Sequence, residues 1–120
     1  MRDHRKLKAW HLADALALTV YRATLTFPKA ELFGLTAQMR RGAVSVASNI
    51  VEGSARRSEA DYLRFLDMAF AAARELQYHV SLAQRLGYLK PELAEELESS
   101  CTETCRVLSG LMRSLREPAP

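Results

Sequence analysis

The 120-residue sequence has few of the residues that interrupt helices or cross-link small folds: five Gly, four Pro and two Cys. Two cysteines cannot build a disulfide framework, and Cys101 and Cys105 lie one helical turn apart. We therefore expect reduced, buried thiols in a cytoplasmic protein. No apolar run approaches the roughly 20 residues that cross a bilayer, and none follows the basic N-terminus. We expect no contact with a membrane and no secretory signal.

Common catalytic and metal-binding motifs are also missing. There is no P-loop, dinucleotide fingerprint or G-x-S-x-G elbow. The three histidines are scattered and form no pair with the spacing that helical bundles use for metal ions. Ser45 and Ser48 have no histidine near them in sequence to act as a base. We therefore expect no catalytic residue, no metal and no cofactor, and a function other than catalysis.

Apolar residues recur at helical spacing and predict four long helices, over about 7–25, 35–53 or slightly beyond, 58–87, and from 91 onward. Local signals mark their ends: Phe27-Pro28 stops the first helix, and Ser58 with Asp61 caps the third. Gly87 suits a left-handed cap, and Pro91 suits a first helical turn. A short connector over 29–34 has room for one further turn.

Four amphipathic helices with short joints predict an all-α, up-down-up-down four-helix bundle. We expect a single domain over 1–120, with a basic segment at 1–6 and a frayed tail at 117–120. The first two helices each have an apolar inner face. That of the first helix is predicted to hold Trp10, Ala13, Leu16, Ala17, Val20 and Tyr21. That of the second is predicted to hold Leu35, Met39, Gly42, Ala43, Val46 and Ile50.

The second helix carries a polar stripe opposite its apolar face. Its members fall within an arc of roughly 100° and are Gln38, Arg41, Ser45, Ser48, Asn49, Glu52 and Arg56. For Arg41 we favour an ion pair with Glu52 or with Glu75 of the third helix, because buried charge is usually paired. We predict that Gln38, Arg41, Ser45, Asn49, Glu52 and Glu75 form a polar network, either structural or facing another subunit.

The basic residues suggest a second kind of surface. Residues 1–60 carry ten Lys or Arg and five Asp or Glu, whereas residues 61–120 carry seven and nine. The basic half suits phosphate, and the acidic half could meet a basic partner, including another copy of the chain; ordinary solvated charge is the alternative. We predict phosphate contacts at Lys6, Lys8, Arg40, Arg56 and Arg57. Arg40 and Arg57 are expected to project away from the stripe, because adjacent helical residues point about 100° apart.

One long segment resembles a known family. Its elements are Phe27-Pro28, Phe33-Gly34-Leu35-Thr36, Arg40-Arg41, Ser48 and Asn49-Ile50-x-Glu52-Gly53. They are similar to the four-helix-bundle proteins encoded by intervening sequences within bacterial 23S ribosomal RNA genes. The likeness extends to Trp10, Phe65-Leu66, Ala69, Glu75 and Leu86-Gly87-Tyr88-Leu89. The chain departs from the pattern at Gly42, where alanine is expected, and at Val46-Ala47, where proline is frequent.

The resemblance implies a homopentamer of four-helix protomers and brings no catalytic residue. It also implies a relation to accessory variability proteins of diversity-generating retroelements, which bind nucleic acid through basic surfaces and partner a reverse transcriptase. Our leading hypothesis is a homo-oligomeric bundle that binds structured RNA or DNA electrostatically. Base specificity is not expected, because no reading helix or stacking aromatics are visible in the sequence. The rival hypothesis is an assembly or adaptor protein that binds a protein partner and has no nucleic-acid affinity.

Overall fold

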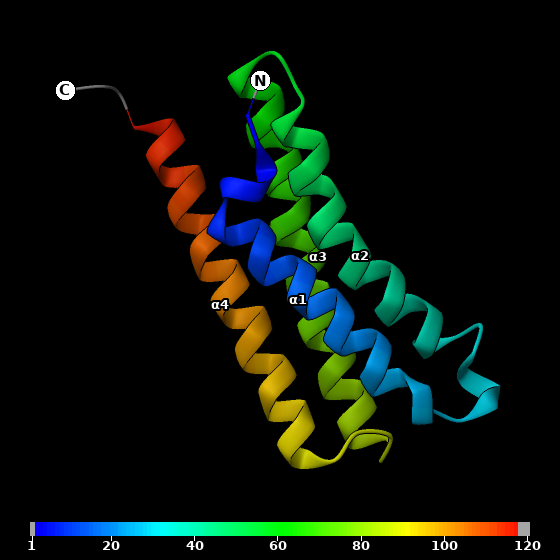
Figure 1. Ribbon diagram of the computed structural model, residues 1–120. Helices are drawn as coiled ribbons and strands as arrows, with labels where there is room; N and C mark the ends of the chain where they lie inside the picture. Colours follow the sequence, from blue (N-terminus) through cyan, green and yellow to red (C-terminus); the bar gives the residue numbers. More distant parts are fainter. Residues whose placement is uncertain (1, 118–120) are drawn as a thin grey trace.

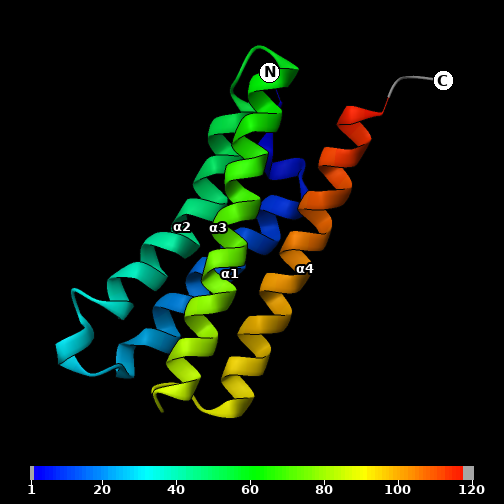
Figure 2. The ribbon, with the colours of Figure 1, turned by 180° about the vertical axis from the view of Figure 1, so that it is seen from behind.

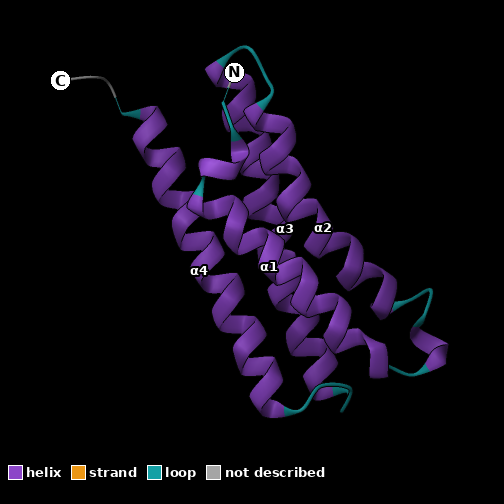
Figure 3. Cartoon of the chain, in the orientation of Figure 1, coloured by secondary structure: helices purple, strands orange, loops and turns teal. Residues whose placement is uncertain are grey.

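A computed structural model describes residues 2–117 of the chain and contains four long helices (Figure 1). They are α1 (Lys8–Ala23), α2 (Leu35–Ser54), α3 (Glu59–Arg85) and α4 (Pro91–Arg116). Successive helices run in opposite directions, and Figure 3 shows only helices and loops among the described residues. The predicted up-down-up-down bundle is confirmed. Of the tail predicted to be frayed, 118–120 lie outside the described residues.

Each helix packs against two neighbours in an elongated bundle of 51 × 23 × 19 Å. The pairs in contact are α1 with α2, α2 with α3, α3 with α4, and α1 with α4. Helices α1 and α3 therefore occupy one diagonal of the bundle, as the front and back views indicate (Figures 1 and 2). The N-terminal segment lies at the same end as the α2–α3 turn (Figure 1). The α1–α2 connector and the α3–α4 joint lie at the opposite end (Figure 1).

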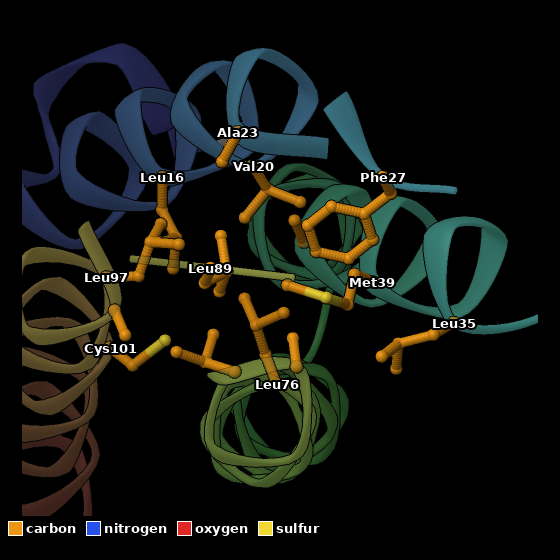
Figure 4. Packing of buried hydrophobic residues seen from close by; sticks show 14 residues of the cluster. Leu16, Val20, Ala23, Phe27, Leu35, Met39, Leu76, Leu89, Leu97 and Cys101 are labelled. Carbon is orange, nitrogen blue, oxygen red and sulfur yellow. The ribbon is translucent and has the colours of Figure 1, made fainter. Parts of the chain in front are cut away.

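The core is built from the predicted apolar faces and forms two clusters along the bundle axis. The cluster near the α1–α2 connector includes Leu16, Met39, Leu76 and Leu97, which point toward one another from the four helices (Figure 4). The other cluster, near the α2–α3 turn, includes Ile50, Tyr62, Leu66 and Leu108. Within residues 2–117, no helix has the length and apolar character needed to span a membrane.

Local capping signals set the helix ends where the sequence predicts them. The Ser58 hydroxyl accepts a hydrogen bond from the Asp61 backbone N–H at 3.1 Å and begins α3. Gly87, at a φ of +83°, ends that helix. The N–H groups of Gly87 and Tyr88 return to the carbonyls of Gln84 and Ala83, which is the Schellman arrangement. Pro91 then occupies the first turn of α4, as predicted.

The start of α2 is fixed by a contact that the sequence analysis did not predict. Glu31 lies in the one-turn 3₁₀ helix η3 (Lys29–Glu31), which confirms the expected turn in the connector. Its carboxylate accepts the backbone N–H of Leu35 at 3.1 Å and the Tyr88 hydroxyl at 2.9 Å. Because the Tyr88 hydroxyl donates this hydrogen bond to the Glu31 carboxylate, the pKa of Tyr88 is raised. One carboxylate thus caps α2 and joins the α1–α2 connector to the α3–α4 joint.

The predicted first helix extends to Phe27-Pro28 as expected, but its last turn has a different geometry and one residue of its inner face was assigned wrongly. The α-helical geometry stops at Ala23, and a 3₁₀ turn, η2 (Thr24–Thr26), continues to Phe27-Pro28. There the Thr24 hydroxyl donates to the Val20 carbonyl at 2.8 Å and is buried. Tyr21, assigned to the inner face, is 45% exposed because it lies at the α1–α2 edge beneath Arg40. In α2, Gly42 is half-buried at the edge of the apolar face.

Two glycines of α2 provide a matched test of packing. A methyl group on Gly53 would lie 2.8 Å from the Phe65 Cβ and 3.2 Å from the Tyr62 ring, whereas nothing lies within 4 Å of one on Gly42. We expect Gly42→Ala to stabilise the protein by about 0.5–1 kcal/mol through helix propensity. Gly53→Ala should destabilise it, because overpacking strain of about 1–3 kcal/mol exceeds that gain. Urea unfolding at one protein concentration measures both changes.

Equal stabilisation by both substitutions would contradict the close approach of α2 and α3 at Gly53. The comparison controls for backbone entropy, because the same chemical change is made twice within one helix.

The Glu31 contact gives a second test. Glu31→Ala removes the acceptor for both Leu35 and Tyr88, whereas Tyr88→Phe removes one donor and leaves the helix cap in place. We expect Glu31→Ala to lower the Tm by about 4 °C and Tyr88→Phe to lower it less. Thermal unfolding followed by circular dichroism measures the difference. If the two variants melt alike, capping of α2 contributes nothing beyond the Tyr88 hydrogen bond.

Candidate nucleic-acid interface

The five predicted phosphate contacts do not form one surface on the protomer. Arg56 and Arg57 follow the end of α2, at the α2–α3 turn. Lys6 and Lys8 lie at the start of α1, and the Lys8 pair with Glu103, midway along α4, sets that lysine back from the turn. Arg40 precedes Arg56 by 16 residues on a helical path, which separates them by about 24 Å. The predicted contacts therefore lie at the α2–α3 turn, at the start of α1 and, separately, near the α1–α2 connector.

The two lysines stand on exposed positions near the start of α1. Lys6 belongs to the 3₁₀ turn η1 (His4–Lys6), and among the described residues it makes no ion pair. The Lys8 Nζ lies 3.7 Å from a Glu103 carboxylate oxygen. The Lys8 side chain is 67% exposed, so this pair is screened by water and adds little stability. Both amines remain accessible to solvent.

At the α2–α3 turn, three arginines surround a hollow of about 550 Å³. Its lining residues are Arg2, Ala55, Arg56 and Arg57. Arg2 donates from Nη1 to the Arg56 carbonyl oxygen at 3.1 Å. Its guanidinium lies over the Tyr62 ring, 4.1 Å from the centroid. Arg57 is exposed and, within residues 2–117, has no ion-pair partner.

Arg56 is the most constrained of these side chains. Its guanidinium lies over the Phe65 ring at 4.7 Å from the centroid, and its Nη2 is 3.4 Å from a Glu52 carboxylate oxygen. The Nε is buried and has no hydrogen-bond partner among the described residues. The Arg64 guanidinium also lies 4.6 Å from the Phe65 centroid, and it pairs with Asp61. Phe65 thus supports arginines from both sides of the turn.

Arg40 is half-buried between α1 and α2, which differs from the expected outward projection. Its Nε donates to the Thr24 hydroxyl at 2.8 Å, and its guanidinium lies 4.8 Å from the Tyr21 ring centroid. It borders a hollow of about 290 Å³ that Lys29 and Thr36 also line. Arg40 therefore bridges two helices of the protomer, and its contact with phosphate stays a prediction.

The polar stripe of α2 lies on the protomer surface, beside α3. Gln38, Arg41 and Ser45 line a hollow of about 360 Å³ together with Glu75. Within the described chain, the Arg41 side chain makes neither of the expected ion pairs, with Glu52 or with Glu75.

The hydrogen bonds made within the stripe are few. Asn49 donates from Nδ2 to the Ser45 carbonyl and hydroxyl oxygens, at 2.8 and 3.0 Å. Glu52 contacts Arg56 instead of Arg41. The wider network therefore stays a prediction, and most of its polar groups face outward from a single protomer.

The cysteines and one histidine are buried in the bundle. Cys101 and Cys105 are both free thiols, and burial raises the pKa of the Cys101 thiol to about 12. Its thiolate form is therefore negligible at neutral pH. His79, which the sequence left unassigned, is 7% exposed on α3, and its Nδ1 lacks a hydrogen-bond partner among the described residues. Residues 2–117 hold no group of three His, Cys, Asp or Glu placed to share a metal ion.

The residues that sequence analysis missed are Arg2 and the aromatic rings beneath the arginines. Arg2 and Arg56 are 54 positions apart, and Tyr21 and Arg40 are on different helices. No periodic pattern relates such pairs. The signal that could have drawn attention to Phe65 is its position shortly after the Arg56-Arg57 pair, across a turn too short to carry the chain away.

Comparison with known proteins fits this geometry. The chain is similar in fold to the crystal structure of a protein of unknown function from the S23 ribosomal protein family of Bacteroides thetaiotaomicron, with a TM-score of 0.81. The two are 23% identical, and the match covers 88% of this chain and 95% of the other. A comparison with curated proteins found no match. The model of the 23S rRNA-intervening sequence protein family matches residues 5–110. With its four-helix bundle and this match over most of its length, the chain belongs to the 23S rRNA-intervening sequence protein family.

Proposed function

We propose that this protein is a non-enzymatic, cytoplasmic, homo-oligomeric bundle that binds structured RNA or DNA through the phosphate backbone. The observation that supports the proposal is the α2–α3 turn, where Arg56 and Arg57 line a hollow that no acidic residue of the described chain lines, with the exposed Lys6 and Lys8 at the start of α1. Exposed cations attract a polyanion without reading its sequence. The reduced, buried cysteines are consistent with a cytoplasmic location.

Self-association is supported by apolar side chains at the opposite end. Phe33 is 92% exposed, Leu25 is 74% exposed and Leu32 is 51% exposed, all in or beside the α1–α2 connector. Single exposed apolar residues are ordinary, but three large ones lie within nine positions of this connector surface, and Leu25 and Leu32 line the same hollow. Such a surface favours a partner. We infer that other copies of the chain cover it. The family resemblance sets the expected number of copies at five.

A second candidate function rests on the same connector. An adaptor protein would use Leu25, Leu32 and Phe33 to dock a different protein and would have no affinity for nucleic acid. Apolar docking buries few charges, so its affinity changes little with salt, whereas phosphate binding weakens steeply. Salt dependence therefore separates the two functions.

Fluorescence anisotropy with a structured RNA and a DNA duplex tests the nucleic-acid function. We expect the nuclease-treated protein to bind both with micromolar or tighter affinity. The logarithm of the binding constant should fall against the logarithm of salt by about 0.9 for each phosphate neutralised on duplex DNA. Absence of binding at low salt would overturn this function and favour the adaptor.

Light scattering coupled to size-exclusion chromatography tests self-association. We expect the wild type to elute as an oligomer and Leu25→Gln/Phe33→Gln to have the mass of one chain, because the double substitution removes the exposed apolar contacts. Tyr78→Gln is the matched control, since Tyr78 is 58% exposed on α3 and should leave the mass unchanged. A monomeric wild type, or an oligomeric double variant, would exclude this interface.

A further inference from the structure

The hollow at the α2–α3 turn has an unusual lining. Three of its four lining residues are arginines, the fourth is Ala55, and no acidic residue lines it. The nearest ion pair links Arg56 to Glu52, whose side chain is 58% exposed. An exposed pair of this kind is weak and is readily exchanged for a better partner. The hollow therefore concentrates positive charge that, among the described residues, the fold neutralises only through this one exposed pair.

The chain holds two of these arginines in place with buried aromatic rings. Tyr62 and Phe65 are one helical turn apart at the start of α3, and they are only 2% and 8% exposed. Arg2 lies over the first ring and Arg56 over the second. A guanidinium that rests on an aromatic face keeps its N–H edges free while it loses rotational freedom. Two of the arginine side chains that line the hollow are thus held in place before any ligand binds.

Gly53 explains how α2 reaches these rings. Its Cα carries no side chain, so the end of α2 lies directly against Phe65 and Tyr62. The turn then places Arg56 above Phe65, and the N-terminal segment returns to place Arg2 beside the Arg56 carbonyl. Arg57 contributes its charge with no competing ion pair among the described residues.

We propose that Arg2, Arg56 and Arg57 form a subsite for a backbone phosphate of RNA or DNA. The planar fork of a guanidinium matches two phosphate oxygens, and three forks around one hollow suit a tetrahedral anion better than a planar carboxylate. A volume of about 550 Å³ leaves room for the sugars on either side. This inference rests on the proposed nucleic-acid function and names the residues, including Arg2, that perform it.

A plainer role for Arg2 is to cap the end of α2 through the Arg56 carbonyl. That role predicts lower stability in an Arg2 variant and no effect from Arg57, which the fold does not use. The nucleic-acid affinity of Arg57→Gln therefore separates a role in phosphate binding from a role in folding. The double variant Arg2→Gln/Arg57→Gln then tests whether the two arginines act together in phosphate binding.

The experiment compares these variants with Arg22→Gln/Arg74→Gln, which removes two exposed arginines elsewhere. Neither control residue makes an ion pair within residues 2–117. Anisotropy with an RNA hairpin and a DNA duplex across a salt series should show about tenfold weaker binding for Arg57→Gln and a larger loss for the double variant. The salt slope should fall by about one for each arginine removed, and the control should retain wild-type values.

If the subsite variants and the control lose affinity equally, or if none loses affinity, the subsite is overturned while the nucleic-acid function stands. If the wild type binds neither RNA nor DNA, the proposed function fails. The phosphate subsite is then tested separately, by the thermal stabilisation that pyrophosphate gives at matched ionic strength. Stabilisation of the wild type and of the control, but not of Arg2→Gln/Arg57→Gln, then supports phosphate binding by these arginines. Equal responses overturn it.

Discussion

The close approach of α2 and α3 is the constraint on which the rest of this structure depends. At Gly53 a single methyl group would meet the Phe65 Cβ at 2.8 Å, so the two helices touch through a position where only hydrogen fits without displacement. Small residues are fully buried in both helices, among them Ala43 of α2 and Ala73 of α3. Helices that pack at this distance hold the α2–α3 turn rigidly. This contact therefore helps to set the positions of the Tyr62 and Phe65 rings and of the arginines that lie over them.

The sequence predicted the helices well because their ends are determined locally. Ser58 and Gly87 each act on a backbone group within five residues, and Pro91 acts through its own ring. The candidate site was less predictable because its contacts join distant parts of the chain. Arg2 and Arg56 meet only after the N-terminal segment folds against α2. Tyr21 is exposed because it lies at the α1–α2 edge, beneath Arg40. Hydrophobic periodicity identifies the apolar face of a helix, but it does not show which edge of that face a neighbouring helix will cover.

The outer surface differs in character between the two ends of the bundle. Large apolar side chains, led by Phe33, are exposed at the connector end, whereas the arginine hollow lies at the end formed by the α2–α3 turn. The stripe of α2 begins near the connector with Gln38 and Arg41, which line a shallow hollow beside α3. With 51 Å separating the extremes of the bundle, a subunit docked near the connector need not cover the hollow. Assembly and phosphate binding can therefore coexist on one chain.

Geometry also connects the two proposed activities. In a cyclic oligomer every protomer is related by rotation about one axis, so equivalent ends lie at the same height along that axis. A ring of these bundles would present one arginine hollow per copy on a single face. One hollow with three arginines neutralises few phosphates and binds weakly on its own, but linked sites act at high effective concentration along one polyanion. Because the aromatic rings hold the guanidiniums before binding, each added copy would lose little conformational freedom on contact. The close α2–α3 packing at Gly53 would then order one arginine hollow in every copy of the ring. The affinity for nucleic acid would arise from the number of these hollows instead of from base recognition.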